Sequence, residues 1–184
     1  MTLYQNHVRD WELCTRCDLC KQRKHVVLAR GSVPADVLFV GEAPGSSEDV
    51  LSQPFRGPAG ILLDHIVQSA LPDPEPSICF TNLVACIPKG ESGTKMGEPL
   101  PVSIEACAPR LIEFIKICKP RLFICVGTLA TKWLPKILKN VEWYRDQATV
   151  SIVHPAFIKR AEEYAQPLII KKCIITLSDS FAEL

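Results

Sequence analysis

The sequence predicts an α/β protein: one three-layer αβα domain over residues 1–184, with a central, mostly parallel sheet of four strands. Two observations support this prediction. Short apolar runs of strand length alternate along the chain with longer stretches of helical periodicity. The runs are apolar at nearly every position, as expected of parallel strands that helices cover on both faces. No repeat or low-complexity tract divides the 184 residues, a length sufficient for one sizeable core.

Four apolar runs are the predicted strands, and they lie at residues 37–40, 78–84, 122–126 and 149–153. Four residues fall just past the ends of strands: Glu42, Phe55, Asn82 and His154. The first of these belongs to a turn of sequence GEAPG at 41–45. Because the carboxyl ends of parallel strands share one edge, where ligands of open α/β sheets bind, we expect these residues to meet.

Helical periodicity fills the gaps between the strands. Residues 59–70 place an apolar stripe on one face, and residues 104–118 follow Ser103, which we expect to cap that helix. Residues 129–138 predict a third helix, which Pro135 bends or splits. We also expect a helix or loop–helix at 4–24, a last helix at 156–165, and loops at 72–76 and 87–101.

Composition excludes several functional classes. The net charge is +1, so any contact with nucleic acid must come from a local basic patch. No apolar run approaches the roughly 20 residues that span a bilayer, and residues 1–12 lack the apolar region of a signal peptide. We therefore expect a cytoplasmic protein with no membrane partner.

Nine cysteines are unusual for such a chain. In a reducing compartment they are buried thiols or metal ligands rather than disulfides. Four of them stand among apolar residues and are interpreted as core residues: Cys79, Cys118, Cys125 and Cys173. Cys14 and Cys17 have the spacing of metal ligands, but two ligands do not make a site.

Three side chains near the predicted edge suit a flat polar base. Phe55 offers a ring face, and the Asn82 amide offers a donor and an acceptor in one plane. An imide edge such as that of uracil matches this amide, whereas cytosine presents the opposite polarity. His154 has a donor for a carbonyl oxygen that gains negative charge. Each residue alone is typical of a turn, a loop or a core, so only their joint placement favours a site.

Six motifs in order resemble the family 4 uracil-DNA glycosylases, the iron–sulfur class of the uracil-DNA glycosylase superfamily. The resemblance extends from Cys14 to Arg160. The motifs are CTRC at 14–17, GEAPG at 41–45 with Glu48 and Asp49, PFRGPAG at 54–60, TNLVAC at 81–86, EAC at 105–107 and HPA at 154–156.

The resemblance implies a role for each site residue. Glu42 would position the attacking water, and His154 would stabilise the departing uracil at O2. Phe55 would stack on the flipped base, Asn82 would bind its Watson–Crick edge, and Glu48 would shape the pocket near C5. Gly41, Ala43 and Asp49 complete the implied substrate-binding set. Ile158 is the candidate wedge for the gap in the DNA, and Lys159 and Arg160 are candidates for phosphate contacts.

The resemblance also implies a 4Fe-4S cluster. Its ligands would be Cys14, Cys17, Cys86 and Cys107, which would tie an N-terminal arm of about residues 1–30 to the 86–107 segment. Zinc takes the same four ligands, so the sequence does not separate the two metals. Cys20 continues the spacing of the first pair and competes with Cys17; we interpret it as a bystander.

The implied function is a monofunctional DNA repair glycosylase that removes uracil from single- or double-stranded DNA and acts as a monomer. The pocket motifs hold no lysine for a Schiff base. Alternatives are a relative that binds DNA without catalysis or acts on a modified pyrimidine, and a redox protein built around the cluster. The chain departs from the family at Ser52 and Gln53, where a glycine is usual, at Ala156, where a serine is usual, and in the long 89–101 loop.

Overall fold

A computed structural model of the protein describes residues 1–90, 97–142, 144 and 147–184. Five strands form one sheet in the order β1-β3-β2-β4-β5. They are β1 (Arg30–Gly31), β2 (Val37–Gly41), β3 (Ile78–Asn82), β4 (Leu122–Val126) and β5 (Ala148–Ile152). The predicted mostly parallel sheet is confirmed, but the number of strands is five and not four. The additional strand, β1, has two residues, pairs antiparallel with β3 and has no apolar run to mark it.

Strand order places the site at the edge of the sheet. β2 lies between β3 and β4, so the chain passes to one side of β2 and then returns to the other. Ligands of open α/β sheets bind outside the carboxyl ends of the strands at such a reversal. The parallel register sets Gly41, the last residue of β2, beside Asn82, the last residue of β3.

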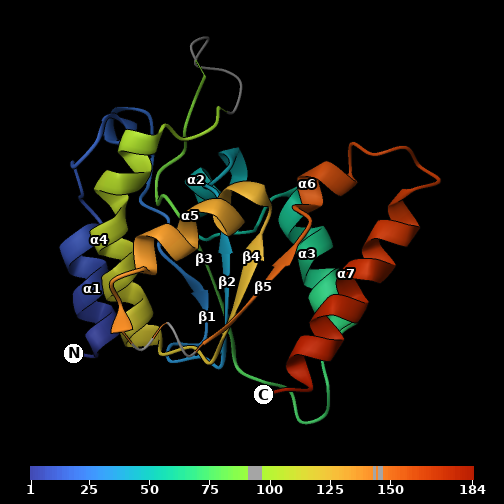
Figure 1. Ribbon diagram of the computed structural model, residues 1–184. Coiled ribbons are helices and arrows are strands. Elements are labelled where there is room, and N and C mark those ends of the chain that lie inside the picture. The colour runs from blue at the N-terminus through green and yellow to red at the C-terminus, as the bar shows by residue number, and fades with distance from the viewer. Residues whose placement is uncertain (91–96, 143, 145–146) are drawn as a thin grey trace.

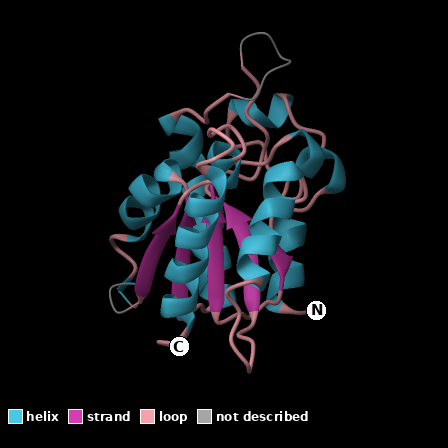
Figure 2. Ribbon diagram, turned by 90° about the vertical axis from the view of Figure 1, so that its right-hand side faces the viewer, coloured by secondary structure: helices cyan, strands magenta, loops and turns pink. Residues whose placement is uncertain are grey.

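Helices cover both faces of the sheet (Figures 1 and 2). One face carries α1 (Leu3–Trp11), α4 (Pro101–Cys118) and α5 (Thr128–Leu138), and the other carries α3 (Pro58–Gln68), α6 (Pro155–Ile158) and α7 (Gln166–Phe181). Two short helices, η1 (Asp18–Lys21) and α2 (Ser46–Leu51), belong to the connections. Neighbouring residues of a strand point to opposite faces, so Leu38 packs in the first core and Phe39 in the second.

The four cysteines predicted as core residues are all buried. Cys79, Cys118 and Cys125 lie in the core beneath α4 and α5, and Cys173 lies in the core beneath α7. No helix in the described part of the chain is long and apolar enough to cross a bilayer.

Several predicted helix boundaries are wrong. The α4 helix begins at Pro101 with Leu100 as its N-cap, and Ser103 is a buried residue inside it. The α5 helix continues through Pro135 without a break. The expected helix at 156–165 is only the four-residue α6, and the long helix α7 follows later. Its buried positions Cys173, Leu177 and Phe181 recur every fourth residue, a stripe that polar neighbours interrupt in the sequence.

Candidate active site

The carboxyl edge of the sheet opens into a cavity of about 890 Å³. This volume is within the range of small-molecule sites and has room for a nucleoside. Strand ends that are distant in sequence supply its polar groups: Glu42 after β2, Asn82 on β3 and His154 after β5. Phe55 also lines it, so the four side chains expected at one edge do lie around one cavity.

The Phe55 ring and the Asn82 carboxamide both lie over Gly41. A Cβ atom at Gly41 would lie 2.4 Å from Oδ1 of Asn82 and 2.5 Å from Cζ of Phe55. Real Cβ atoms do not approach other heavy atoms this closely, so a side chain at this position would push the ring and the carboxamide out of place. Gly41 therefore forms the floor of a slot between the ring and the carboxamide, rather than a contact of its own in the cavity.

The surrounding structure holds Phe55 in an unfavourable backbone conformation. Its φ is +55°, in the left-handed region that bulky residues rarely adopt. Gly60 permits this turn, because a Cβ there would lie 2.1 Å from the carbonyl oxygen of Phe55. Arg30 of β1 donates from Nε to the carbonyl oxygen of Pro54 (3.1 Å) and pairs with Asp64 through both of its terminal nitrogens. A strained backbone that several surrounding contacts hold in place is typical of functional sites.

Glu48 holds the loops that frame the cavity. Its carboxylate accepts hydrogen bonds from the backbone N–H groups of Gly45 (3.0 Å), Arg56 (2.9 Å) and Gly57 (2.7 Å). The side chain lines the cavity between the GEAPG turn and the start of α3. Its position therefore suits the expected role of shaping the pocket, which it does by fixing the two loops.

Glu42 is a half-buried carboxylate at the end of β2. Burial raises the pKa of its carboxyl above the ordinary value, and the nearby charge of Glu98 raises it further. Within the described residues its side-chain oxygens bind no protein group, so they are free to hold a water molecule in the cavity.

His154 presents a neutral imidazole with a defined tautomer. Burial lowers its pKa, the Arg160 cation lowers it further, and the Glu48 charge opposes both. Its Nδ1 accepts a hydrogen bond from the backbone N–H of Ala156 (3.1 Å), which leaves the proton on Nε2. Nε2 is thus a neutral donor available to a ligand in the cavity.

Asp49 does not belong to the cavity, which corrects its placement in the substrate-binding set. Its side chain is buried and accepts hydrogen bonds from the backbone N–H groups of Lys24 (2.8 Å) and His25 (3.3 Å). The adjacent positions of Glu48 and Asp49 on α2 point in different directions. Asp49 therefore fastens the N-terminal arm to α2.

The structure also corrects the candidate wedge. Ile158 is fully buried in the core beneath α3 and α7, so it does not reach a DNA surface. Its neighbour Phe157 is 54% exposed and lines the rim of the cavity together with Arg160. Lys159, the C-cap of the same short helix, is exposed but lies outside the cavity lining.

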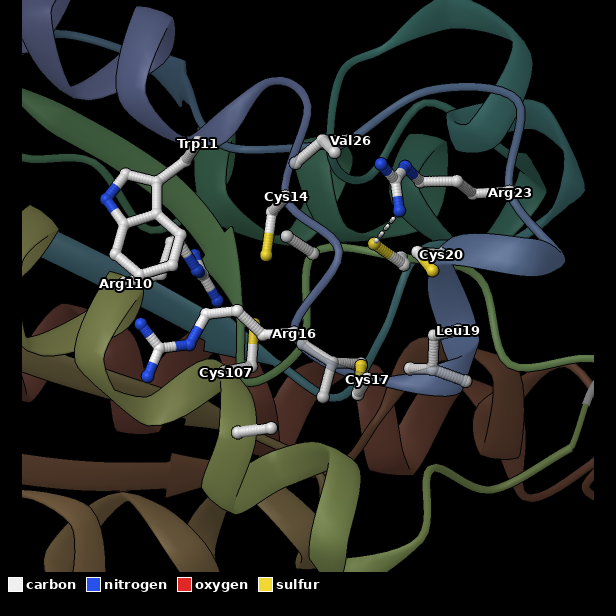
Figure 3. A pocket seen from close by; sticks show the side chains of 14 residues that line it. Trp11, Cys14, Arg16, Cys17, Leu19, Cys20, Arg23, Val26, Cys107 and Arg110 are labelled. Carbon is white, nitrogen blue, oxygen red and sulfur yellow. Dashed lines mark hydrogen bonds between the residues drawn. The ribbon is translucent and has the colours of Figure 1, made fainter.

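A second pocket is lined by all four cysteines that are expected to bind the cluster. Cys14 and Cys17 from the arm, Cys86 after β3 and Cys107 on α4 all line it (Figure 3). Arg23 donates to the sulfur of Cys86 at 3.7 Å. Cys20 lines the same pocket, so the structure leaves it beside the four predicted ligands. Trp11, Leu19 and Val26 supply much of the remaining, mostly apolar wall.

These cysteines are free thiols. Burial raises the pKa of the Cys86 thiol to about 12 and also raises that of Cys17. Among the described residues no three His, Cys, Asp or Glu side chains are grouped closely enough for a single metal ion. The four thiols line one shared pocket.

Sequence analysis missed Arg30 and Phe157 as site residues. Arg30 acts through a strand of two residues, which carries no periodic signal. Phe157 carried one signal: it follows a motif residue, His154, by three positions, which is nearly one helical turn. A residue on that side of the turn, rather than Ile158, faces the cavity.

The chain is similar to known proteins over most of its length. A family model described as the uracil DNA glycosylase superfamily matches residues 28–178. The Type-4 uracil-DNA glycosylase of Archaeoglobus fulgidus is 28% identical over 166 residues, covering 82% of this chain and 80% of that protein. That of Thermotoga maritima is 29% identical over 157 residues, covering 80% and 78%. That of Pyrobaculum aerophilum is 38% identical over 125 residues, covering 68% and 61%.

Proposed function

Because this chain belongs to the uracil DNA glycosylase superfamily, we propose that it is a monofunctional uracil-DNA glycosylase of DNA repair. Its substrate is uracil-containing DNA, single- or double-stranded, and its products are free uracil and an abasic site. One observation carries the proposal. A ring, a carboxamide, a neutral imidazole donor and an open carboxylate surround one nucleoside-sized cavity.

The slot over Gly41 accepts the everted base. Eversion costs a few kcal/mol, which stacking on Phe55 and hydrogen bonding to Asn82 repay. The Asn82 carboxamide donates to one carbonyl of uracil and accepts its N3–H, a pairing that cytosine cannot make. Ala43 and Glu48 bound the cavity beside the base. This arrangement favours uracil over the ordinary bases of DNA.

Breaking the N-glycosidic bond separates charge. The sugar gains cation character at C1′ and the base leaves with the bond electrons, so negative charge develops at O2. The Nε2–H of His154 donates to this oxygen without needing a proton from solvent. The ionised Glu42 accepts a proton from the water that attacks C1′, which completes the abasic site.

DNA contacts come from the rim of the cavity. We propose Phe157, in place of Ile158, as the side chain that enters the gap left by the base, since it is larger and more exposed than Val153, the other exposed apolar side chain in the described lining. Arg160 and Lys159 are exposed cations beside it and suit flanking phosphates.

The cysteine pocket suits a 4Fe-4S cluster held by Cys14, Cys17, Cys86 and Cys107. A four-thiol donor set in a mostly apolar wall is the usual setting for such a cluster. When bound, the group supplies a covalent cross-link between the N-terminal arm, α4 and the segment after β3.

We also propose a monomer in the cytoplasm. One chain supplies the whole described lining of the cavity, so the site needs no partner copy. Free thiols suit a reducing compartment. Sedimentation of the purified protein tests the first proposal.

The test is incubation with an oligonucleotide that carries one uracil, followed by alkali and gel analysis. Cleavage at uracil, with none at cytosine or thymine in matched strands, supports the function. Asn82→Ala and His154→Ala each lose about a hundredfold or more of the excision rate, as expected for a lost transition-state donor. Tight binding of uracil DNA with no cleavage would instead favour the alternative, a relative that binds without catalysis.

A further inference from the structure

Arg110 of α4 is a buried cation with no carboxylate partner. Its side chain is 1% exposed, the largest fully buried side chain in the described structure. Among the described residues no Asp or Glu forms an ion pair with it. Arginine stays protonated in proteins, so the charge persists in this interior. A buried charge without a counterion is strongly unfavourable.

One side of the guanidinium holds the end of β3. A terminal nitrogen donates to the carbonyl oxygens of Asn82 (2.6 Å) and Leu83 (3.0 Å), and the other donates to Oγ1 of Thr81 (3.1 Å). Thr81 in turn donates to the carbonyl oxygen of Leu28 (2.7 Å). Asn82 is the residue whose carboxamide forms one wall of the base slot. Arg110 therefore fixes the backbone from which the base-reading side chain projects.

Arg110 also borders the cysteine pocket. It lies three residues after Cys107 and so on the same side of α4 (Figure 3). Its Nε is buried and has no hydrogen-bond partner among the described residues. Buried donors are nearly always satisfied, so an orphan at this position indicates a missing acceptor.

We propose that Arg110 is a positioning residue that joins the cysteine pocket to the base slot. Four thiolates outweigh the positive charge of an iron–sulfur core, so the ligated cluster carries net negative charge. That charge is the counterion of the buried guanidinium, and a cluster or cysteine sulfur is the acceptor for Nε–H. In return, the anchored guanidinium holds the carbonyls of Asn82 and Leu83. This inference rests on the proposed glycosylase function and on the proposed cluster.

Two substitutions separate the effect of the Arg110 charge from the effect of its fork, the two terminal nitrogens that donate together to the end of β3. Arg110→Met removes the cation while keeping a long side chain, and Arg110→Lys keeps the cation but loses the paired donors. Lys116→Gln removes an exposed cation from the same helix and serves as the matched control. Each protein is purified without oxygen. Its iron content, the rate at which a chelator bleaches its visible absorbance, and its uracil excision rate are then measured.

We expect Arg110→Met to bleach at least tenfold faster than the parent and to excise uracil at least tenfold more slowly. Arg110→Lys keeps a bleaching rate within about threefold of the parent, because the charge remains, yet it shares the excision defect, because the fork is lost. Lys116→Gln matches the parent in both. If Arg110→Met does not fold, Arg110→Gln takes its place, because it also removes the charge and is held to the same expected bleaching and excision rates.

The inference is overturned if either Arg110 variant excises uracil at the parental rate, or if the chelator bleaches Arg110→Met no faster than the parent. It is equally overturned if Arg110→Lys bleaches as fast as Arg110→Met. A parent protein that contains iron but leaves uracil DNA intact would sink the proposed function instead, and the bleaching rates would still test the contact between Arg110 and the cluster.

Discussion

At the scale of single residues, the base slot depends on close approaches that a side chain at one position would abolish. Gly41 lies beneath both the Phe55 ring and the Asn82 carboxamide, and Gly60 lies beneath the strained backbone of Phe55. Both glycines belong to motifs of the sequence, but the close approaches that explain why glycine is present are visible only in the structure. The slot is therefore preorganised before any base arrives, which reduces the cost of binding.

Gly41→Ala tests this slot. The new Cβ would meet the ends of two side chains, which must move apart, so the fold survives while the slot is deformed. We expect uracil excision to fall by about a hundredfold or more, with a modest decrease in Tm. Excision kinetics and thermal melting measure the two effects. An active Gly41→Ala enzyme would mean that the base binds elsewhere.

The pH dependence of excision follows from Glu42 and His154. Burial raises the pKa of Glu42 above its ordinary value of 4.5, and the carboxylate is the active form. Burial lowers the pKa of His154 below 6.5, so its neutral form predominates at neutral pH. Both groups are then in their active states near neutrality. The rate decreases as the pH falls through the raised pKa of Glu42, where the carboxylate becomes protonated.

Single-turnover rates between about pH 4 and pH 8 measure this acid limb. Glu42→Gln cannot ionise, so it removes the part of the limb that belongs to Glu42 and lowers the plateau by about a hundredfold or more. If the Glu42→Gln variant has the parental pH profile, a group other than Glu42 causes the loss of rate at low pH.

Sequence motifs predicted the residues that meet in the cavity but not the direction of every side chain. Glu42, Phe55, Asn82 and His154 follow from strand ends in a parallel sheet. Asp49 and Ile158 were misplaced because successive residues of a helix point about 100° apart, and periodicity alone did not orient such short helices. That error is one of local geometry rather than of chemistry.

At the scale of elements, the single helical turn of α6 shows that neighbouring residues of one motif can face opposite sides. Its four residues put Phe157 at the rim of the cavity and Ile158 in the core. Pro155 at the start of α6 and the cap from His154 fix which residue faces outward. The strand β1 is a comparable case, since its Arg30 braces the Phe55 turn although the sequence carries no strand signal there.

Substitutions at these two neighbours should separate binding from stability. Phe157→Ala leaves Tm nearly unchanged, because the ring is exposed, but lowers excision from double-stranded DNA more than from single-stranded DNA, which has no stacked partner to replace. Ile158→Ala creates a core cavity and costs about 2–5 kcal/mol of unfolding free energy. Melting curves and excision rates on both substrates test the pair. The opposite pattern would restore Ile158 as the wedge.

At the scale of the whole molecule, the N-terminal arm connects the two pockets. Asp49 fastens its residues 24 and 25 to α2 beside the base cavity, and the cysteine-lined pocket adjoins α4. His7 and Trp11 of α1 both bind Glu113 of α4, which secures the start of the arm. The alternation of strands and helices predicted the sheet, whereas this cross-connection depends on contacts between segments about 100 residues apart and leaves no periodic trace in the sequence.

The cluster ligands can be tested across the whole fold. Cys107→Ser and Cys14→Ser each remove a proposed ligand and should lose most of the iron, the visible absorbance near about 400 nm and several degrees of Tm. Cys20→Ser is the matched control, because it changes a thiol in the same pocket that the proposal assigns no iron. If Cys20→Ser loses iron and Cys17→Ser retains it, Cys20 and not Cys17 is the ligand. A colourless, zinc-loaded parent would refute the cluster. Because the arm is tied to both pockets, loss of iron should also slow uracil excision even though no cysteine lines the base cavity.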